Sequence, residues 1–419
     1  MPGRGIRLTL VAALAALLAP PVGAGPAPAA PLAPPIAQHV APPIAQRALP
    51  GCDDDTPPAQ PITTPPWAQQ RYAPERLTPL ATGAGVTVAV IDSGVDDTHP
   101  QLKGRVLRGR DFLEPGLDGT RDCARHGTGV ASIIAATPRD GVAFRGVAPG
   151  VKILPVRLTE QKVIEGKTSG DPADVGTFAQ SIRWAVDNGA EVINLSVVLY
   201  DDDPTIERAV EYALEKDVVI VAAAGNQYAE GNRTPYPASY DGVIGVGSVG
   251  EDGVVSPFSQ RGGYVDLVAP GGKVTVAVPE RGHVVENGTS FATPFVTATV
   301  ALIRQYWPEL NARQVAQRLV ASADPVPGSS RDAYGAGMLN PYRAVTDTAA
   351  PGRRQEAGGL PAHEVDPVEV ARAERRAAAQ ERALWVAGLA GTVALLALLL
   401  AVVMPRGMRR GWRPAGPPP

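Results

Sequence analysis

The sequence of 419 residues has no excess of positive charge, few cysteines and few histidines. It has 39 lysines and arginines and 42 aspartates and glutamates, and the resulting net charge of −3 argues against a nucleic-acid-binding protein. With only two cysteines, Cys52 and Cys123, the chain can form one internal disulfide at most. Many of its 43 prolines lie outside the middle of the chain, so ordered structure is expected between about residues 66 and 349.

The first part of the chain has the features of an exported protein. Residues 1–24 combine Arg4 and Arg7 with the apolar run LTLVAALAALLA and a small-residue site ending at Ala24. This pattern is typical of a secretory signal peptide, although a short amphipathic anchor would also fit. Residues 25–66 are rich in Pro and Ala and show no hydrophobic period, which predicts an extended arm rather than a folded domain.

Residues 383–404, ALWVAGLAGTVALLALLLAVVM, are uncharged and predict a single membrane-spanning helix. About twenty such residues cross about 30 Å of hydrocarbon as a helix. Residues 350–382 are interpreted as a linker and juxtamembrane helix, and residues 405–419 as a short tail. Arginines flank the span on both sides, so the signal peptide decides the orientation: the body is exported and the tail stays in the cytoplasm.

An exported chain with two cysteines predicts one disulfide, between Cys52 and Cys123. It would close a loop of about seventy residues, which the chain-entropy treatment values at about 4 kcal/mol. It would also tie the arm to the body close to His126. Two free thiols are the alternative.

The body alternates short apolar segments with helical patterns. VTVAVID, VKILPVRL, AEVINLSVV and VVIVAAAGN are typical of buried strands, and HGTGVASIIAAT, VGTFAQSIRWAVDNG and TIERAVEYALEKD of helices. Such alternation predicts an α/β fold with a doubly wound, mostly parallel sheet and helices on both faces. In that fold ligands bind at the carboxyl ends of the strands.

Four side chains with complementary chemistry lie at predicted element ends. Asp92 and Asn226 each end a strand, His126 begins a helix, and Ser290 begins another in NGTSFATPFVTATVALI. The alternative for the last segment is that Thr289 or Ser290 is only an N-cap, a residue whose side chain accepts an unpaired backbone N–H. Pro294 would fall in the first helical turn, where its missing N–H costs little.

These residue types suit nucleophilic catalysis. A serine hydroxyl is a weak nucleophile at neutral pH, so an imidazole must take its proton, and a carboxylate must orient that imidazole. The Asn226 amide and the Ser290 backbone N–H could then stabilise an oxyanion, a contribution of about 3 kcal/mol.

Four segments in order, VAVIDSGVDDTHPQL, HGTGVASIIAA, AAAGN and NGTSFATP, resemble the subtilisin-like serine proteases. The resemblance implies a protease domain over residues 67–349, a catalytic triad of Asp92, His126 and Ser290, and an oxyanion hole of Asn226 and Ser290. It implies serine endopeptidase activity on protein substrates without a cofactor. An inactive scaffold would be expected to have lost one of these residues.

The layout of signal peptide, arm, protease body and membrane helix resembles the mycosins, the membrane-anchored proteases of type VII secretion systems. This implies that the chain cleaves selected exported proteins and associates with the membrane complex of such a system. A structural subunit with secondary catalysis and a housekeeping surface protease are the alternatives. The resemblance also implies that residues 25–66 wrap the catalytic domain and do not act as a folded propeptide.

The segment matching the family's substrate-binding strand departs from the usual pattern. Leu195, Ser196 and Val197 are expected to bind substrate, but Val197 and Val198 stand where many relatives have Gly. A narrower or reshaped pocket and narrow specificity are therefore predicted. Residues 160–174 are long for a strand-to-helix link and predict a lid or docking loop.

The remaining polar clusters are interpreted as structural, and no metal site is expected. His99 is expected to be a packing residue and His283 a surface residue. Asp96 and Asp97 are interpreted as a solvated turn rather than a metal site. The run of three aspartates at residues 201–203 is expected to precede and cap a helix that starts near Thr205, because consecutive acids lack the alternating spacing of a calcium loop.

Overall fold

The computed structural model describes residues 59–160, 162–164, 167–169, 174–348, 404–406, 408–409 and 411. The predicted signal peptide, most of the predicted arm, Cys52 and residues 383–403 lie outside the described residues. In the part of the chain that is described, no helix is both long and apolar enough to cross a membrane.

A seven-stranded sheet in the order β2-β3-β1-β6-β7-β8-β9 forms the centre of the domain, and its neighbouring strands pair in parallel. The predicted doubly wound parallel sheet is therefore confirmed. The strands are β1 (Thr87–Asp92), β2 (Arg110–Asp111), β3 (Lys152–Arg157), β6 (Val192–Leu195), β7 (Val219–Ala223), β8 (Ile244–Val249) and β9 (Leu267–Pro270). The carboxyl ends of β1, β6 and β7 therefore lie at one edge of the sheet.

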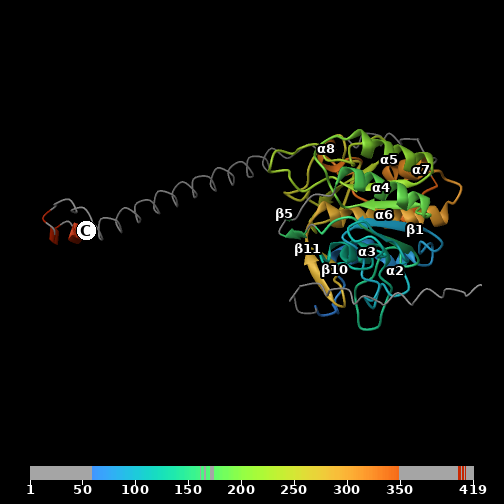
Figure 1. The fold of residues 1–419 in the computed structure, drawn as a ribbon, viewed down its shortest axis with the longest axis horizontal. Helices are drawn as coiled ribbons and strands as arrows, with labels where there is room; N and C mark the ends of the chain where they lie inside the picture. The colour runs from blue at the N-terminus through green and yellow to red at the C-terminus, as the bar shows by residue number, and fades with distance from the viewer. Residues whose placement is uncertain are drawn as a thin grey trace, which may run out of the picture. The chain divides into compact units, whose positions relative to one another are not determined.

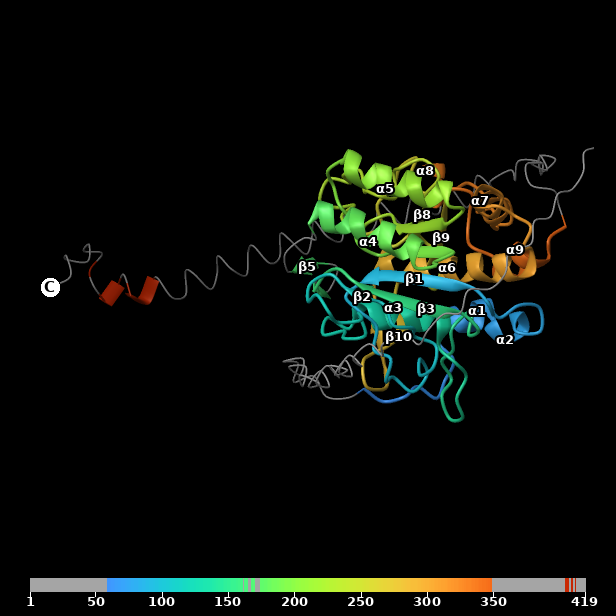
Figure 2. The same cartoon turned by 45° about the vertical axis from the view of Figure 1, so that its right-hand side comes forward.

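Helices cover both faces of this sheet, as Figure 1 and Figure 2 show for α4 and α5 on one side and α3 on the other. The longer helices are α3 (His126–Ala135), α4 (Val175–Asp187), α5 (Pro204–Glu215), α6 (Thr289–Tyr306) and α7 (Ala312–Ala321). The shorter ones are α1 (Trp67–Tyr72), α2 (Pro74–Leu77), α8 (Arg331–Tyr334) and α9 (Pro341–Thr346). Two hairpins complete the described elements: β4 (Lys162–Ile164) with β5 (Lys167–Ser169), and β10 (Val274–Ala277) with β11 (His283–Glu286).

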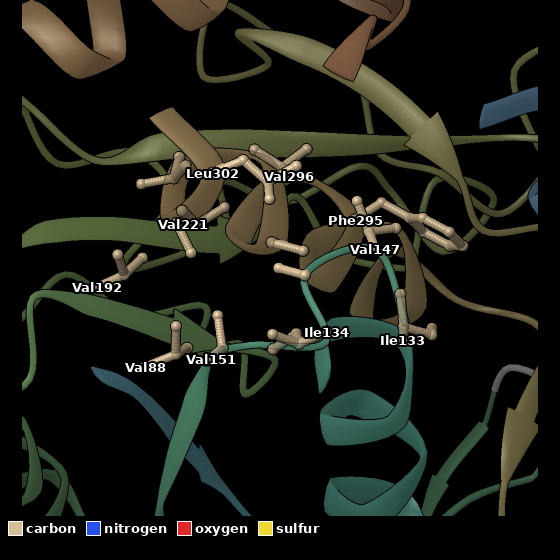
Figure 3. Packing of buried hydrophobic residues seen from close by; sticks show 14 of the residues in the cluster. Val88, Ile133, Ile134, Val147, Val151, Val192, Val221, Phe295, Val296 and Leu302 are labelled. Atoms are coloured by element: carbon tan, nitrogen blue, oxygen red, sulfur yellow. The ribbon is translucent and has the colours of Figure 1, made fainter. Parts of the chain in front are cut away.

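Alternate side chains of each strand enter two separate cores. Val88 of β1 joins the core that contains α3 and α6, whereas Ile91 joins the core that contains α4 and α5. Figure 3 shows the first core, where Val88 and Val221 of the sheet lie with Ile133 of α3 and Val296 of α6. Because both faces are buried, the strands read as continuous apolar runs rather than as alternating patterns.

The start of helix α5 agrees with the prediction from the sequence, whereas the start of helix α6 differs from it. Asp203 accepts a hydrogen bond from the backbone N of Thr205 at 2.7 Å, so the predicted acidic cap of α5 is confirmed. Helix α6, in contrast, begins after Gly288 with no side-chain cap, and the N-cap interpretation of Thr289 or Ser290 is wrong. Pro294 also lies inside α6 rather than in its first turn, because the helix already begins at Thr289.

Two of the expected surface groups are buried. His283 is 8% exposed, and its Nε2 lies 2.8 Å from Oε1 of Gln101, so the prediction of a surface histidine is wrong. Asp96 is buried and accepts hydrogen bonds from the backbone N of Thr98 and of Glu280, at 2.9 and 2.6 Å. A fully solvated turn is therefore wrong for Asp96.

Asp97 and His99 follow the expectation. Asp97 is exposed, whereas His99 is buried and its Nδ1 accepts a hydrogen bond from the backbone N of Gln101 at 3.2 Å. The packing role predicted for His99 is confirmed.

The described end of the predicted arm lies on the domain. The carbonyl oxygen of Gln60 accepts from the backbone N of His283 at 3.2 Å, and that of Ile62 accepts from the backbone N of Ala143 at 2.8 Å. These bonds join the arm to β11 and to the segment that follows α3. Whether the preceding residues continue along the same surface stays a prediction.

Arg157 at the end of β3 is expected to contribute strongly to stability. Its side chain is 1% exposed and its Nη1 lies 2.6 Å from the buried Asp111, so Arg157→Met would keep much of the volume but leave that carboxylate unpaired. We expect the variant to lose about 3–5 kcal/mol of unfolding free energy. Urea unfolding followed by tryptophan fluorescence measures this loss.

The matched control is Arg108→Met. The Arg108 side chain is 90% exposed, and its Nε forms a long ion pair of 3.7 Å with Oδ2 of Asp118. An exposed pair of this kind contributes little, so the control should unfold at the urea concentration of the wild type. Equal midpoints for the two variants would contradict the role given to Arg157.

Candidate active site

Asp92 and His126 meet where β1 ends and α3 begins. Nδ1 of His126 lies 2.8 Å from Oδ1 and 3.0 Å from Oδ2 of Asp92, whose side chain is 2% exposed. Oδ1 of Asp92 also accepts a hydrogen bond from the backbone N of Ser93 at 2.7 Å. A carboxylate held in this way orients the imidazole and keeps a proton on Nδ1. The structure thus brings together two side chains that the sequence predicted to be neighbours.

Behind this pair lies a second buried carboxylate, which the sequence analysis missed. Asp122 accepts hydrogen bonds from the backbone N of Arg125 and of Thr128, at 2.8 and 2.7 Å, and from Oγ of Ser93 at 2.7 Å. Arg125 precedes α3 and makes no side-chain cap, so Asp122 caps the helix from the loop. The Oγ of Ser93 in turn accepts from the backbone N of Gly127 at 2.9 Å. An acidic residue four positions before His126 was the available sequence signal.

Ser290 lies in the first turn of α6, one residue before a ring that packs against the histidine. The ring of the following residue, Phe291, is 4.9 Å from the His126 ring between centroids. Oγ of Ser290 and Nε2 of His126 are both buried, and neither has a hydrogen-bond partner among the described residues. Unpaired buried polar atoms are rare and costly, and catalytic hydrogen bonds often form only when substrate is bound. The two atoms are therefore available for chemistry.

Asn226 is fixed to the start of the same helix. Its Oδ1 accepts from the backbone N and from Oγ1 of Thr289, at 2.8 and 2.9 Å, which leaves the amide nitrogen as the other end of the side chain. A Cβ on Gly288 would lie 2.8 Å from Oγ of Ser290 and 3.6 Å from Nδ2 of Asn226. The hydroxyl and the amide nitrogen thus border the same point, which only a glycine at 288, with φ 156°, leaves open.

The charges around His126 favour its protonated form. Burial is the largest single influence and opposes protonation, but the charge and hydrogen bond of Asp92, together with the charges of Asp122 and Glu286, outweigh it, so the pKa of His126 is raised. Glu286 of β11 was also missed in the sequence. Burial raises the pKa of its carboxyl, and the nearby His126 and Arg125 oppose that rise.

Two of the three side chains in the predicted substrate-binding segment are buried. The side chains of Leu195 and Val197 are buried in the core that contains α4 and α5, with 0% and 8% exposure. The Oγ of Ser196 donates to the carbonyl oxygen of Ser290 at 3.0 Å. Substrate binding by residues 195–197 stays a prediction, and it would depend on their main chain.

Metal and disulfide predictions can be examined only in the described part of the chain. There, no group of three histidine, cysteine or acidic side chains is placed to hold a metal ion. Cys123 is not a free thiol, and its Sγ lies 3.3 Å from Nε of Arg121. Because Cys52 lies outside the described residues, its pairing with Cys123 stays a prediction.

Comparison with known proteins gives the same family from sequence and from structure. The profile of the Subtilase family matches residues 83–337. A thermophilic serine proteinase of Bacillus sp. (strain AK1) is 39% identical over 264 residues, which cover 63% of this chain and 62% of that protein. Mycosin-4 of Mycobacterium tuberculosis is 36% identical over 363 residues, covering 76% of this chain and 77% of that protein.

A solved structure to which this chain is similar also belongs to a protease of a type VII secretion system. The MycP3 protease from the type VII (ESX-3) secretion system superimposes with a TM-score of 0.59 at 31% identity. The match covers 69% of this chain and 91% of that chain. The predicted likeness to subtilisin-like proteases, and to mycosins among them, is confirmed.

The charge environment of His126 is testable by NMR titration of the full chain, with the histidine assigned from the spectrum of a His126→Gln variant. We expect a His126 pKa above the ordinary value of about 6.5. Glu286→Gln should lower it, because removing a negative charge destabilises the imidazolium. In the Glu286→Gln variant, His126 would therefore stay neutral down to a lower pH than in the wild type, and a reaction that needs neutral His126 would continue to that lower pH.

Glu251→Gln is the control, because Glu251 is exposed on the turn after β8, and it should leave the His126 pKa unchanged. A His126 pKa below the ordinary value, or one that ignores Glu286→Gln, would refute this electrostatic description.

Proposed function

This chain belongs to the subtilase family of serine proteases, and from that premise we propose that it cleaves selected exported proteins with Ser290 as the nucleophile. His126 acts as the general base, and Asp92 orients it. The observation that carries the proposal is the contact of Nδ1 of His126 with both oxygens of Asp92, while Nε2 and the Ser290 hydroxyl remain without partners in the described structure.

The proposed reaction proceeds in two halves. Oγ of Ser290 attacks the scissile carbonyl carbon and its proton passes to Nε2 of His126, while the Asp92 carboxylate stabilises the resulting imidazolium. When the tetrahedral intermediate collapses, the C–N bond breaks and His126 returns the proton to the leaving amine. Water, deprotonated by His126, then attacks the acyl-enzyme ester; the bond between the acyl carbon and Oγ breaks, His126 returns the proton to Ser290, and the carboxylic acid product leaves.

The oxyanion in both halves would be held by Nδ2 of Asn226 and the backbone N–H of Ser290. Support comes from the bonds that Oδ1 of Asn226 accepts from Thr289, because they turn the amide nitrogen away from Thr289. A single donor of this kind typically contributes about 3 kcal/mol to transition-state stabilisation.

The cellular setting follows from the layout of the chain and its likeness to mycosins. We place the protease domain on the extracytoplasmic side of the cell membrane, anchored by residues 383–404, with residues 405–419 in the cytoplasm. The Cys52–Cys123 bridge would tie the arm beside His126. Association with the membrane complex of a type VII secretion system rests on the similarity to Mycosin-4 and MycP3.

A structural role in the secretion complex is the second candidate function. The membrane segment and the arm would serve a protease and a structural subunit equally well. The complete set of Asp92, His126, Asn226 and Ser290 favours catalysis, because a purely structural subunit has no need of it.

Membrane anchoring predicts the behaviour of truncated chains. The full chain should remain in the pellet after carbonate extraction, because about twenty uncharged residues are buried in hydrocarbon. A chain that ends at residue 382 should appear in the soluble fraction, and one that lacks only residues 405–419 should stay in the pellet. A chain ending at 382 that still resists extraction would disprove the anchor.

The catalytic proposal is tested with Ser290→Ala in a strain that lacks the wild-type gene. A fluorophosphonate probe should label wild-type membranes and leave the variant unlabelled, and substrate processing should fall by a factor of about 10⁴ or more. Ser181→Ala is the matched control, because Ser181 is a buried serine of α4 and should leave labelling unchanged.

Export in the Ser290→Ala strain separates the two candidate functions. Continued export with lost processing would mean that the chain has both roles, and loss of export as well would exclude a purely structural one. Undiminished labelling or processing in the variant would rule out Ser290 as the nucleophile.

A further inference from the structure

Helix α6 contains a proline at a position that affects the nucleophile. In an α-helix the N–H of residue 294 would bond to the carbonyl oxygen of residue 290, four positions earlier. Pro294 has no N–H, and its ring crowds that carbonyl. The carbonyl of Ser290 therefore loses its partner within the helix. It accepts a hydrogen bond from Oγ of Ser196 instead, at 3.0 Å.

Ser196 is the last member of a chain of side-chain hydrogen bonds. Oγ1 of Thr297 lies 2.8 Å from Oδ1 of Asn194 and 3.1 Å from the carbonyl oxygen of Thr293, and Nδ2 of Asn194 donates to Oγ of Ser196 at 3.0 Å. Asn194 and Thr297 are both fully buried. Because an amide nitrogen can only donate, Oγ of Ser196 accepts there, and its single proton is directed to the Ser290 carbonyl.

This network joins the predicted substrate-binding segment to the helix that carries the proposed nucleophile. Asn194 belongs to β6, Ser196 follows it directly, and Thr297 lies two turns into α6. The hydrogen bond from Ser196 is accepted by the main-chain carbonyl of Ser290. The N–H and the hydroxyl of this same residue both have roles in the proposed reaction. The carbonyl belongs to the peptide group that joins residues 290 and 291, so a shift of this part of the backbone would displace residue 290 and with it the attacking oxygen and an oxyanion donor.

We propose that Ser196 is a positioning residue: its hydroxyl replaces the helix bond removed by Pro294 and so fixes the backbone of Ser290. The assignment rests on the proposed function, in which Ser290 is the nucleophile. It also gives Ser196 a different role from the substrate contact predicted from the sequence. A substrate contact would act mainly through KM, whereas a positioning role acts mainly through kcat.

A double-mutant cycle between positions 196 and 294 tests the assignment in the full-length chain. Ser196→Ala removes the donor and should slow fluorophosphonate labelling of Ser290 by about tenfold. Pro294→Ala supplies a backbone N–H at position 294 and should by itself change labelling by no more than about threefold. In the double variant that N–H can bond to the Ser290 carbonyl, so most of the lost rate should return.

The control for loss of a buried serine is Ser181→Ala, whose Oγ donates to the carbonyl oxygen of Phe178 at 2.7 Å within α4. It should leave the labelling rate unchanged, although it removes the same kind of bond. With a peptide substrate, Ser196→Ala should lower kcat with little change in KM. A double variant that is as slow as Ser196→Ala, or an effect confined to KM, would overturn the proposal.

Failure of the proposed function gives a different result. If the wild type does not react with the probe at all, Ser290 is not an activated nucleophile, and the proposed function is wrong. Urea unfolding of the wild type, the two single variants and the double variant then tests whether the Ser196 hydroxyl replaces the helix hydrogen bond that Pro294 removes. Restored stability in the double variant relative to Ser196→Ala would support the replacement, and strictly additive losses would refute it.

Discussion

The site depends on one buried interaction, the hydrogen bond between Nδ1 of His126 and the carboxylate of Asp92. A carboxylate in a side chain that is 2% exposed is costly unless it is paired, and it is paired only if β1 ends where α3 begins. The parallel sheet meets this requirement because it places the carboxyl ends of its strands at one edge. The same pairing orients the imidazole, sets its tautomer and raises its pKa. Fold and chemistry are thus linked through a single contact.

The two helices that carry His126 and Ser290 begin without a side-chain cap of their own, and a residue outside each helix accepts hydrogen bonds at its start. Asp122 accepts the first N–H groups around α3, and Oδ1 of Asn226 accepts the N–H of Thr289 at the start of α6. Each bond therefore has two effects: it satisfies a helix terminus and fixes a residue of the proposed catalytic set relative to another element. Ser196 extends this arrangement to a carbonyl freed by Pro294. The positions of His126 and Ser290 are thus determined by tertiary hydrogen bonds rather than by the helices alone.

The sequence was most informative where local pattern and position agree. Apolar runs predicted the strands, and Asp92, Asn226, His126 and Ser290 were singled out as site candidates because each lies at an element end. Bonds between distant segments leave no local pattern, so the role of Ser196 was missed; Asp122, by contrast, lies only four positions before His126, and that local signal was overlooked. His283 was misassigned because its partner, Gln101, lies on another segment. The N-cap interpretation of Ser290 failed because Gly288 provides the turn and Asn226 provides the acceptor.

The central claim is that four groups far apart in the chain converge on one reacting carbon. A crystal structure of the full-length protein with a phosphonate bonded to Ser290 tests it most directly, because that adduct imitates the tetrahedral intermediate. We predict a phosphoryl oxygen within about 2.7–3.1 Å of both Nδ2 of Asn226 and the backbone N of Ser290, with Nε2 of His126 within hydrogen-bonding distance of the Ser290 oxygen. An adduct whose oxygen points away from Asn226, or a His126 ring separated from Asp92, would contradict the account.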